Sequence, residues 1–137
     1  MALEWCDDLT LGIDEIDRQH RAIFDHFNQL SLACHGGHGD AVVLKLLDFL
    51  EGHIHTHFET EERLMVQYGY PKRDTQIREH RQFAQDVGEL RRKAESDGPS
   101  RMLAAQVAGN MVRWVVHHIR NHDTELVRYI RGCQDAD

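Results

Sequence analysis

The sequence is poor in residues that interrupt helices or cross-link small folds. Its 137 residues include only 2 prolines, Pro71 and Pro99, and 3 cysteines. Cys6, Cys34 and Cys133 are scattered and have no CxxC spacing, which argues against a disulfide framework and fits a reducing compartment. Because the two prolines leave long stretches of the chain uninterrupted, long helices are possible.

The sequence also lacks the features of secreted, membrane and nucleic-acid-binding proteins. The N-terminus, MALEWCDDLT, has no basic segment followed by an apolar one, and no apolar run approaches the ~18 residues of a membrane span. The formal net charge is -7, which disfavours binding to nucleic acid. The short basic run from Arg91 to Lys93 is expected to be a solvated helix face. We therefore expect a cytoplasmic protein that binds neither membrane nor nucleic acid.

Apolar residues recur at three- and four-residue steps along four segments, the pattern of helices with one buried face. The segments expected to be helical are 14–35, 40–68, 74–95 and 100–131. Residues that favour helix N-termini stand at the starts of these segments: Asp14, Asp40, Asp74 and Ser100. Short loops rich in glycine or proline separate them. The sequence thus predicts an all-α, antiparallel, up-down-up-down four-helix bundle that forms a single domain over 1–137.

Residues 1–13 precede the first expected helix and are expected to form an N-terminal arm. The arm carries apolar residues that can pack against the bundle: Leu3, Trp5, Leu9 and Leu11. No internal repeat, linker or low-complexity stretch divides the chain.

Six residues of metal-ligand type lie on the apolar faces of the expected helices. They are His20, His57, Glu61, His80, His118 and Asp123. At ~1.5 Å of rise per residue, all six fall roughly 9 to 20 Å from the same end of an antiparallel bundle. A buried ionised carboxylate is costly unless it is paired or binds a metal, and Glu61 shares a helix face with His57. The pattern predicts a buried metal site.

The carboxylate of the last helix is uncertain from spacing alone. Asp123 follows His118 by five residues, about 140° around an ideal helix, whereas His122 at four residues lies almost beneath it. Asp123 nevertheless shares a face with apolar residues, and a one-turn π-bulge would bring it beside His118. Spacing leaves both residues as candidates.

These residues and their surroundings resemble the hemerythrin family, and most closely its bacterial single-domain members. The matching segments are GIDEIDRQH, HFETEE, YGYPKRDTQIREHRQF and WVVHHIRNHDTEL, in that order along the chain. The resemblance implies two iron ions in a four-helix bundle, bridged by one glutamate, one aspartate and a solvent-derived oxygen, that bind O2 reversibly. It assigns Glu61 and Asp123 as bridges, His20 and His57 to the oxygen-binding iron, and His80 and His118 to the other. It also favours Asp123 over His122.

The chain departs from the family pattern at Gln76, where the third helix normally carries a histidine four residues before His80. Gln76 could bind weakly through its amide oxygen, or a water molecule could take that place. A neighbouring histidine could compensate, although spacing disfavours it: His55, His117 or His122. Alternatively, Gln76 could point into solvent at the start of its helix.

Histidines outnumber carboxylates in this set, unlike the carboxylate-rich sites of oxygen-activating and iron-storing bundles. The resemblance therefore implies an O2 carrier, store or delivery protein, expected to be a monomer. An O2 or redox sensor is a second hypothesis. The third is an enzyme acting on peroxide, nitric oxide or ferrous iron through an iron opened by Gln76. Apolar residues expected to wall a dry cavity are Ile23, Phe24, Phe58, Phe83, Trp114 and Ile119.

Overall fold

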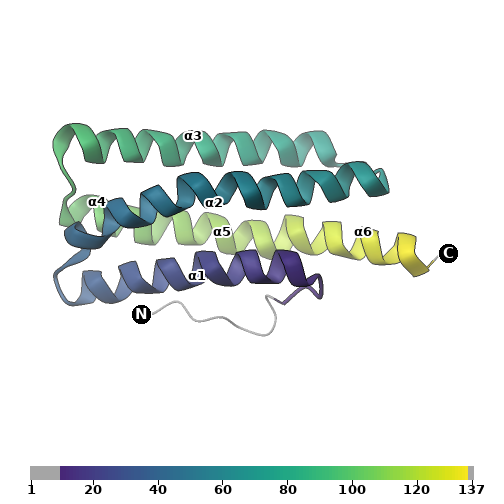
Figure 1. Ribbon diagram of the computed structural model, residues 1–137, viewed down its shortest axis with the longest axis horizontal. Helices are drawn as coiled ribbons and strands as arrows, with labels where there is room; N and C mark the ends of the chain where they lie inside the picture. Colours follow the sequence, from purple (N-terminus) through teal and green to yellow (C-terminus); the bar gives the residue numbers. More distant parts are fainter. Residues whose placement is uncertain (1–9, 136–137) are drawn as a thin grey trace.

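The computed structural model describes residues 10–135, and this part of the chain consists of long helices joined by short loops. The helices form four rods, which lie side by side and alternate in direction (Figure 1). The first three are α1 (Asp14–His35), α2 (Gly39–Tyr68) and α3 (Arg73–Asp97). The fourth is built from five consecutive pieces: α4 (Arg101–Gln106), η2 (Val107–Met111), α5 (Val112–His118), η3 (Ile119–Asp123) and α6 (Thr124–Asp135). The predicted all-α four-helix bundle is confirmed.

The residues that cap the helix starts differ in part from those predicted. Only Ser100 caps its helix as expected, because its hydroxyl accepts a hydrogen bond of 3.0 Å from the backbone N–H of Leu103. Asp14, Asp40 and Asp74 lie inside the first turns of α1, α2 and α3, so their prediction as caps was wrong. There a carboxylate still favours the helix, since the N-terminal turn carries partial positive charge.

Two helix ends depend on glycines with positive φ. Gly69 (φ 63°) ends α2 in the left-handed conformation that closes many helices. Gly98 (φ 84°) ends α3 after Asp97, two residues beyond the predicted end at 95. The last helix runs to Asp135, past the predicted end at 131, because Gly132 stays within it at a modest cost in helix propensity.

The core consists of one large apolar cluster and smaller ones near the other end of the bundle. The large cluster extends along α1, α2, α3 and the fourth rod, up to Phe58 and Ile119. A second cluster joins Met65 of α2 to Leu126 and Ile130 of α6. The residues between Phe58 and Met65 on α2, and between Ile119 and Leu126 on the fourth rod, therefore have apolar packing on both sides along the bundle.

Of the apolar residues expected in the N-terminal arm, Leu11 is buried against Ile16 and Val127. Leu3, Trp5 and Leu9 lie outside the described residues. Asp17 fixes the start of the described chain, because its carboxylate accepts backbone hydrogen bonds from Leu11 and Gly12, at 2.9 and 3.0 Å.

The basic run on α3 is only in part a solvated face. Arg91 crosses to α2, where it pairs with Glu51 and, at 2.9 Å, with Asp48. Arg92 and Lys93 are exposed, as expected.

No helix in residues 10–135 combines the length and apolarity that crossing a membrane requires. In the same range Cys34 and Cys133 are free thiols, whereas Cys6 lies outside it.

Candidate metal centre

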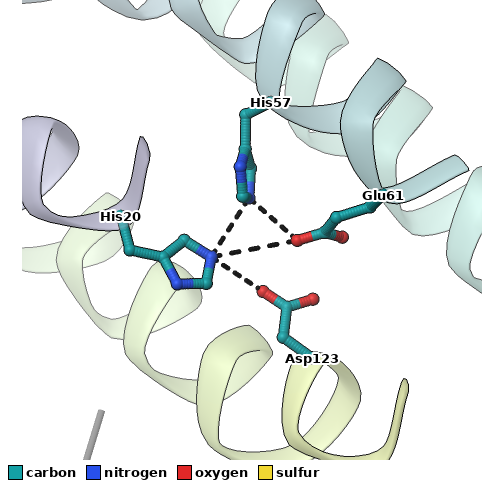
Figure 2. A group of neighbouring side chains, drawn as sticks. All are labelled: His20, His57, Glu61 and Asp123. Atoms are coloured by element: carbon teal, nitrogen blue, oxygen red, sulfur yellow. Dashed lines mark hydrogen bonds and ion pairs between the residues drawn. The ribbon is translucent and has the colours of Figure 1, made fainter. Parts of the chain in front are cut away.

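The six predicted ligand residues come together in the interior of the bundle. His20 comes from α1, His57 and Glu61 from α2, and His80 from α3. The fourth rod supplies His118 from α5 and Asp123 from η3. None of the six is more than 3% exposed. Figure 2 shows His20, His57, Glu61 and Asp123 pointing toward one another from three different helical rods.

A π-helix decides between Asp123 and His122. Residues Ile119–Asp123 form η3, whose wider turn brings Asp123 beneath His118 despite the five-residue spacing. The Oδ1 atom of Asp123 lies 3.0 Å from Nε2 of His118. His122 instead turns outward, and its Nε2 atom lies 3.1 Å from Oε2 of Glu79. The structure thus brings Asp123 into the cluster and leaves His122 out of it.

One histidine pair forms a first subsite with both carboxylates. The Nε2 atoms of His20 and His57 are 3.1 Å apart. His57 Nε2 lies 2.9 Å from Oε1 of Glu61, and His20 Nε2 lies 3.1 Å from Oδ2 of Asp123. The four side chains could hold a metal ion.

A second pair repeats this arrangement beside it. The Nε2 atoms of His80 and His118 are 3.2 Å apart, and His80 Nε2 lies 3.1 Å from Oε2 of Glu61. Glu61, His80 and His118 form a second group that could hold a metal. Glu61 and Asp123 each face the first pair with one oxygen and the second pair with the other. Two carboxylates therefore lie between two histidine pairs.

The carboxylate oxygens are buried without hydrogen-bond donors, which fits a place for cations. All four oxygens of Glu61 and Asp123 lack a hydrogen-bond partner, although histidine nitrogens lie close to them. Leaving an ionised carboxylate buried in this way is costly. A cation between the oxygens and the nitrogens would remove that cost.

The donor atoms of each group lie within 4.8 Å of one another, close enough to share one ion. The closest contacts between their Nε2 and carboxylate oxygen atoms measure between 2.9 and 3.1 Å. Imidazole and carboxylate donors in such an arrangement suit a first-row transition metal.

The electrostatics of the metal-free cluster favour positive charge within it. Burial alone would lower the pKa of His20, but its contacts with Asp123 and Glu61 raise that pKa to about 9. Burial likewise opposes protonation of His118, yet Asp123 and Glu61 raise its pKa well above the ordinary value. Burial would raise the pKa of Glu61, but His57, His118 and His20 hold it well below its usual range. A metal cation would replace protons in this role.

Gln76 is buried on α3, one turn before His80. It is 1% exposed, so the alternative in which it points into solvent was wrong. Its Nε2 atom donates a hydrogen bond of 3.1 Å to the backbone carbonyl of His122, which leaves Oε1 buried without a partner. Of the three histidines considered as compensating ligands, His55 and His117 are exposed and His122 pairs with Glu79.

A small cavity of about 20 Å³ lies beside the cluster, lined by apolar side chains and by four of the predicted ligand residues. Five of the six predicted wall residues line it: Ile23, Phe58, Phe83, Trp114 and Ile119. Phe24 belongs to the packed core and is not among the lining residues. The volume is enough for one water-sized molecule. Phe83 and Trp114 also form part of a larger hollow of about 400 Å³.

Sequence reasoning missed the contacts behind the ligands. Gln19 accepts a hydrogen bond of 2.8 Å from Nδ1 of His57 through Oε1, and its Nε2 atom donates to the Thr60 hydroxyl at 3.0 Å. Phe58 stacks on His80 and Trp114 stacks on His118, with ring centroids 3.8 and 4.7 Å apart. The position of Gln19 next to His20 could have signalled such a role, but many polar residues on helices lie beside a ligand.

Comparison with known proteins finds the family of the sequence resemblance over nearly the whole chain. The hemerythrin HHE cation binding domain matches residues 11–130. The chain is 34% identical over 130 residues to a bacteriohemerythrin of Stenotrophomonas maltophilia, a match that covers 95% of this chain and 82% of that protein. It is 32% identical over 129 residues to a bacteriohemerythrin of Pseudomonas aeruginosa, with coverage of 94% and 82%. A bacteriohemerythrin of Clostridium acetobutylicum is 29% identical over 126 residues, with coverage of 90% and 97%.

Proposed function

The chain belongs to the hemerythrin family, and from this premise we propose that it holds two iron ions and binds O2 reversibly. The observation that supports the proposal most directly is the position of the two carboxylates. Glu61 and Asp123 each face both histidine pairs, and their oxygens have no hydrogen-bond donors. A pair of cations shared by these two carboxylates accounts for both facts.

In this proposal each histidine pair serves one iron. His20 and His57 would hold the first and His80 and His118 the second, and Glu61 and Asp123 would serve both irons. Two ferrous ions held there would supply the electrons for reversible O2 binding. Histidine is a neutral ligand, so the set keeps a net positive charge when both ions are ferrous.

The protein's own side chains would then protect the bound gas from water. The small cavity beside the cluster has room for about one small molecule, and apolar residues supply the walls around the ligand side chains. Phe58 and Trp114 stack flat on His80 and His118 and fix the orientation of both rings. A rigid, dry surrounding of this kind favours binding and release over further reaction.

The test is the metal content of the iron-loaded protein together with its response to air. We expect close to two irons per chain and an absorption band that appears with O2 and disappears when O2 is removed. His57→Ala should abolish the band, whereas His55→Ala, which changes an exposed histidine on the same helix, should preserve it. A protein that retains only zinc, or one iron with no spectral response to O2, would contradict the proposal.

A second candidate function, a di-iron enzyme, is favoured by one observation. Gln76 brings a neutral amide, a weak ligand, to the side of the cluster where His80 and His118 lie. An iron with a weak or exchangeable ligand there could turn over peroxide, nitric oxide or ferrous iron. Multiple turnovers with an added reductant would support the enzyme, and reversible O2 binding without turnover would support the carrier.

A further inference from the structure

The four histidines of the cluster differ in what their outer ring nitrogens contact. All four direct Nε2 into the cluster, so Nδ1 carries the proton if Nε2 binds a metal. In the first pair, Nδ1 of His57 faces the neutral amide oxygen of Gln19 at 2.8 Å. Nδ1 of His20 is buried and has no hydrogen-bond partner. Within residues 10–135, neither histidine of this pair has a carboxylate behind it.

The second pair has a carboxylate behind each ring. Nδ1 of His80 lies 3.2 Å from Oε2 of Glu62, within hydrogen-bond distance. Nδ1 of His118, like that of His20, has no hydrogen-bond partner, but Oε2 of Glu79 lies 3.6 Å from it, within ion-pair distance. The two carboxylates come from different helices, Glu62 from α2 and Glu79 from α3. Glu79 also contacts His122 at 3.1 Å, which holds it near His118.

This difference has a direct effect on ligand strength. A carboxylate that accepts the Nδ1 proton of a metal-bound histidine orients the ring and makes its other nitrogen a stronger donor. A neutral amide does this less. The half-exposed Glu62 and Glu79 thus add negative charge behind one histidine pair only. That pair belongs to the side on which Gln76 stands in place of a histidine.

We propose that Glu62 and Glu79 are positioning residues that strengthen His80 and His118 as ligands and stabilise the ferric state of the iron beside Gln76. The inference rests on the proposed di-iron function. It means that the subsite with the weaker direct ligand set is reinforced from behind. Glu62 should contribute more than Glu79, because 3.2 Å permits a hydrogen bond to Nδ1 and 3.6 Å does not.

Four single variants separate this role from a structural one. Glu62→Gln and Glu79→Gln remove the charge and keep the shape. Gln19→Glu places a carboxylate behind His57, on the opposite pair. Glu59→Gln removes a carboxylate from an exposed position of the helix that carries Glu62 and serves as the matched control.

The first measurement is the stepwise affinity of the metal-free protein for Co²⁺, whose absorption reports each step. Loss of such a carboxylate typically weakens metal binding by about 10- to 100-fold. Because Glu62 is partly exposed, we expect a loss near tenfold in one of the two steps for Glu62→Gln, and a smaller loss in the same step for Glu79→Gln. Gln19→Glu should strengthen the other step, and Glu59→Gln should change neither.

The second measurement is the midpoint potential of the iron-loaded protein. Glu62→Gln should raise it, because the weaker donor stabilises the ferric state less, and Gln19→Glu should lower it. Structural damage would not produce shifts of opposite sign from two conservative changes. The inference is overturned if both variants shift the potential in the same direction, or if Glu62→Gln and Glu79→Gln bind Co²⁺ as the unmodified protein does.

The two proposals fail in different ways. A protein that takes up fewer than two Co²⁺ or iron ions per chain overturns both the di-iron function and this inference. A protein that takes up two ions, with affinities and potentials indifferent to Glu62 and Glu79, overturns only the inference.

Discussion

Asp123 lies directly against His118, with its Oδ1 atom 3.0 Å from Nε2, because the five residues Ile119–Asp123 form a π-helix. In an ideal α-helix this five-residue spacing would turn the carboxylate about 140° away and leave His122 below His118. The wider turn of the π-helix instead places the carboxylate of Asp123 between the histidine pairs and turns His122 toward Glu79.

The π-helix makes a prediction about these two neighbours. Asp123→Asn should remove the charge shared by both subsites and reduce the iron content well below that of the unmodified protein. His122→Ala should leave the iron content nearly unchanged, because the His122 side chain faces Glu79 and the outer side of the His118 ring rather than the inner Nε2 and carboxylate oxygen atoms. Iron per chain after gel filtration is the measurement. If His122→Ala loses the iron and Asp123→Asn retains it, the assignment of the fourth rod is wrong.

Glu61 should matter more than any single histidine. It is fully buried, it faces both histidine pairs, and its oxygens have no hydrogen-bond donors. Glu61→Ala should therefore abolish binding of both cations, whereas loss of one histidine should weaken mainly one subsite. A titration with Co²⁺ distinguishes these results by the number of binding steps. Two intact steps in Glu61→Ala would contradict the bridging role.

The position along the bundle axis at which the predicted ligand residues meet could be predicted from the sequence, because it depends only on regular helix geometry. A constant rise per residue and alternating helix directions place His20 and His80, near helix starts, beside His57 and His118, well before helix ends. The apolar stripes then fix which face of each helix turns inward.

Irregular features could not be predicted in the same way. A π-helix depends on a single inserted residue, so spacing alone left Asp123 and His122 as rivals, and the second π-helix, η2, was not foreseen. The predicted caps were wrong at Asp14, Asp40 and Asp74 because an aspartate is favourable both at the N-cap and within the first turn, so its presence does not fix which of these positions it takes. The orientation of Gln76 depends on a backbone carbonyl from another helix, which has no local sequence signal.

The metal-free protein should lose stability between about pH 6.5 and about 9. The pKa of His20 rises from 6.5 to about 9 in the folded state because its contacts with Asp123 and Glu61 outweigh the opposing effect of burial. A raised folded-state pKa stabilises the fold fully below the unfolded value and loses that contribution as the pH rises through the folded value. The pKa of His118 is shifted in the same direction.

Thermal unfolding of the metal-free protein across this pH range is the measurement. Replacing His20 with glutamine should remove part of the dependence, because the substituted side chain has no proton to lose. Over the same range the affinity for metal should increase with pH, since binding must displace the protons held by the cluster. A melting temperature that rises from pH 6.5 to 9 in the unmodified protein would contradict the raised pKa values of His20 and His118.

Trp114 should protect the site from solvent. Its ring stacks on Phe83 and on His118, with centroids 4.1 and 4.7 Å apart, and it lines both the small cavity and the larger hollow. Trp114→Ala should open a passage between the two and accelerate decay of the O2-dependent absorption band. It should also cost about 2 kcal/mol of stability, below the range for a fully buried ring because Trp114 is half-buried.

Trp114→Phe is the control, since it keeps an aromatic ring against His118. Its band should decay at nearly the rate of the unmodified protein. Equal decay rates in the alanine variant and the unmodified protein would show that Trp114 does not exclude water.

Gln76→His should complete the set of histidine ligands on the third helix. The position is buried one turn before His80, so an imidazole there can reach the same cation. The backbone carbonyl of His122, which now accepts from Gln76, can accept from the new ring and orient it, as the outer contacts of metal-binding histidines do. A neutral amide would thus be replaced by a stronger donor held by the same partner. The variant should retain iron longer against a chelator, by about tenfold or more, and its O2-dependent band should decay more slowly.

Gln76→Leu, which removes both amide atoms and keeps similar bulk, should retain iron less well than either the unmodified protein or Gln76→His. If all three proteins lose iron and decay at one rate, Gln76 lies outside the ligand set, and the enzyme function that depends on a weak ligand there loses its support.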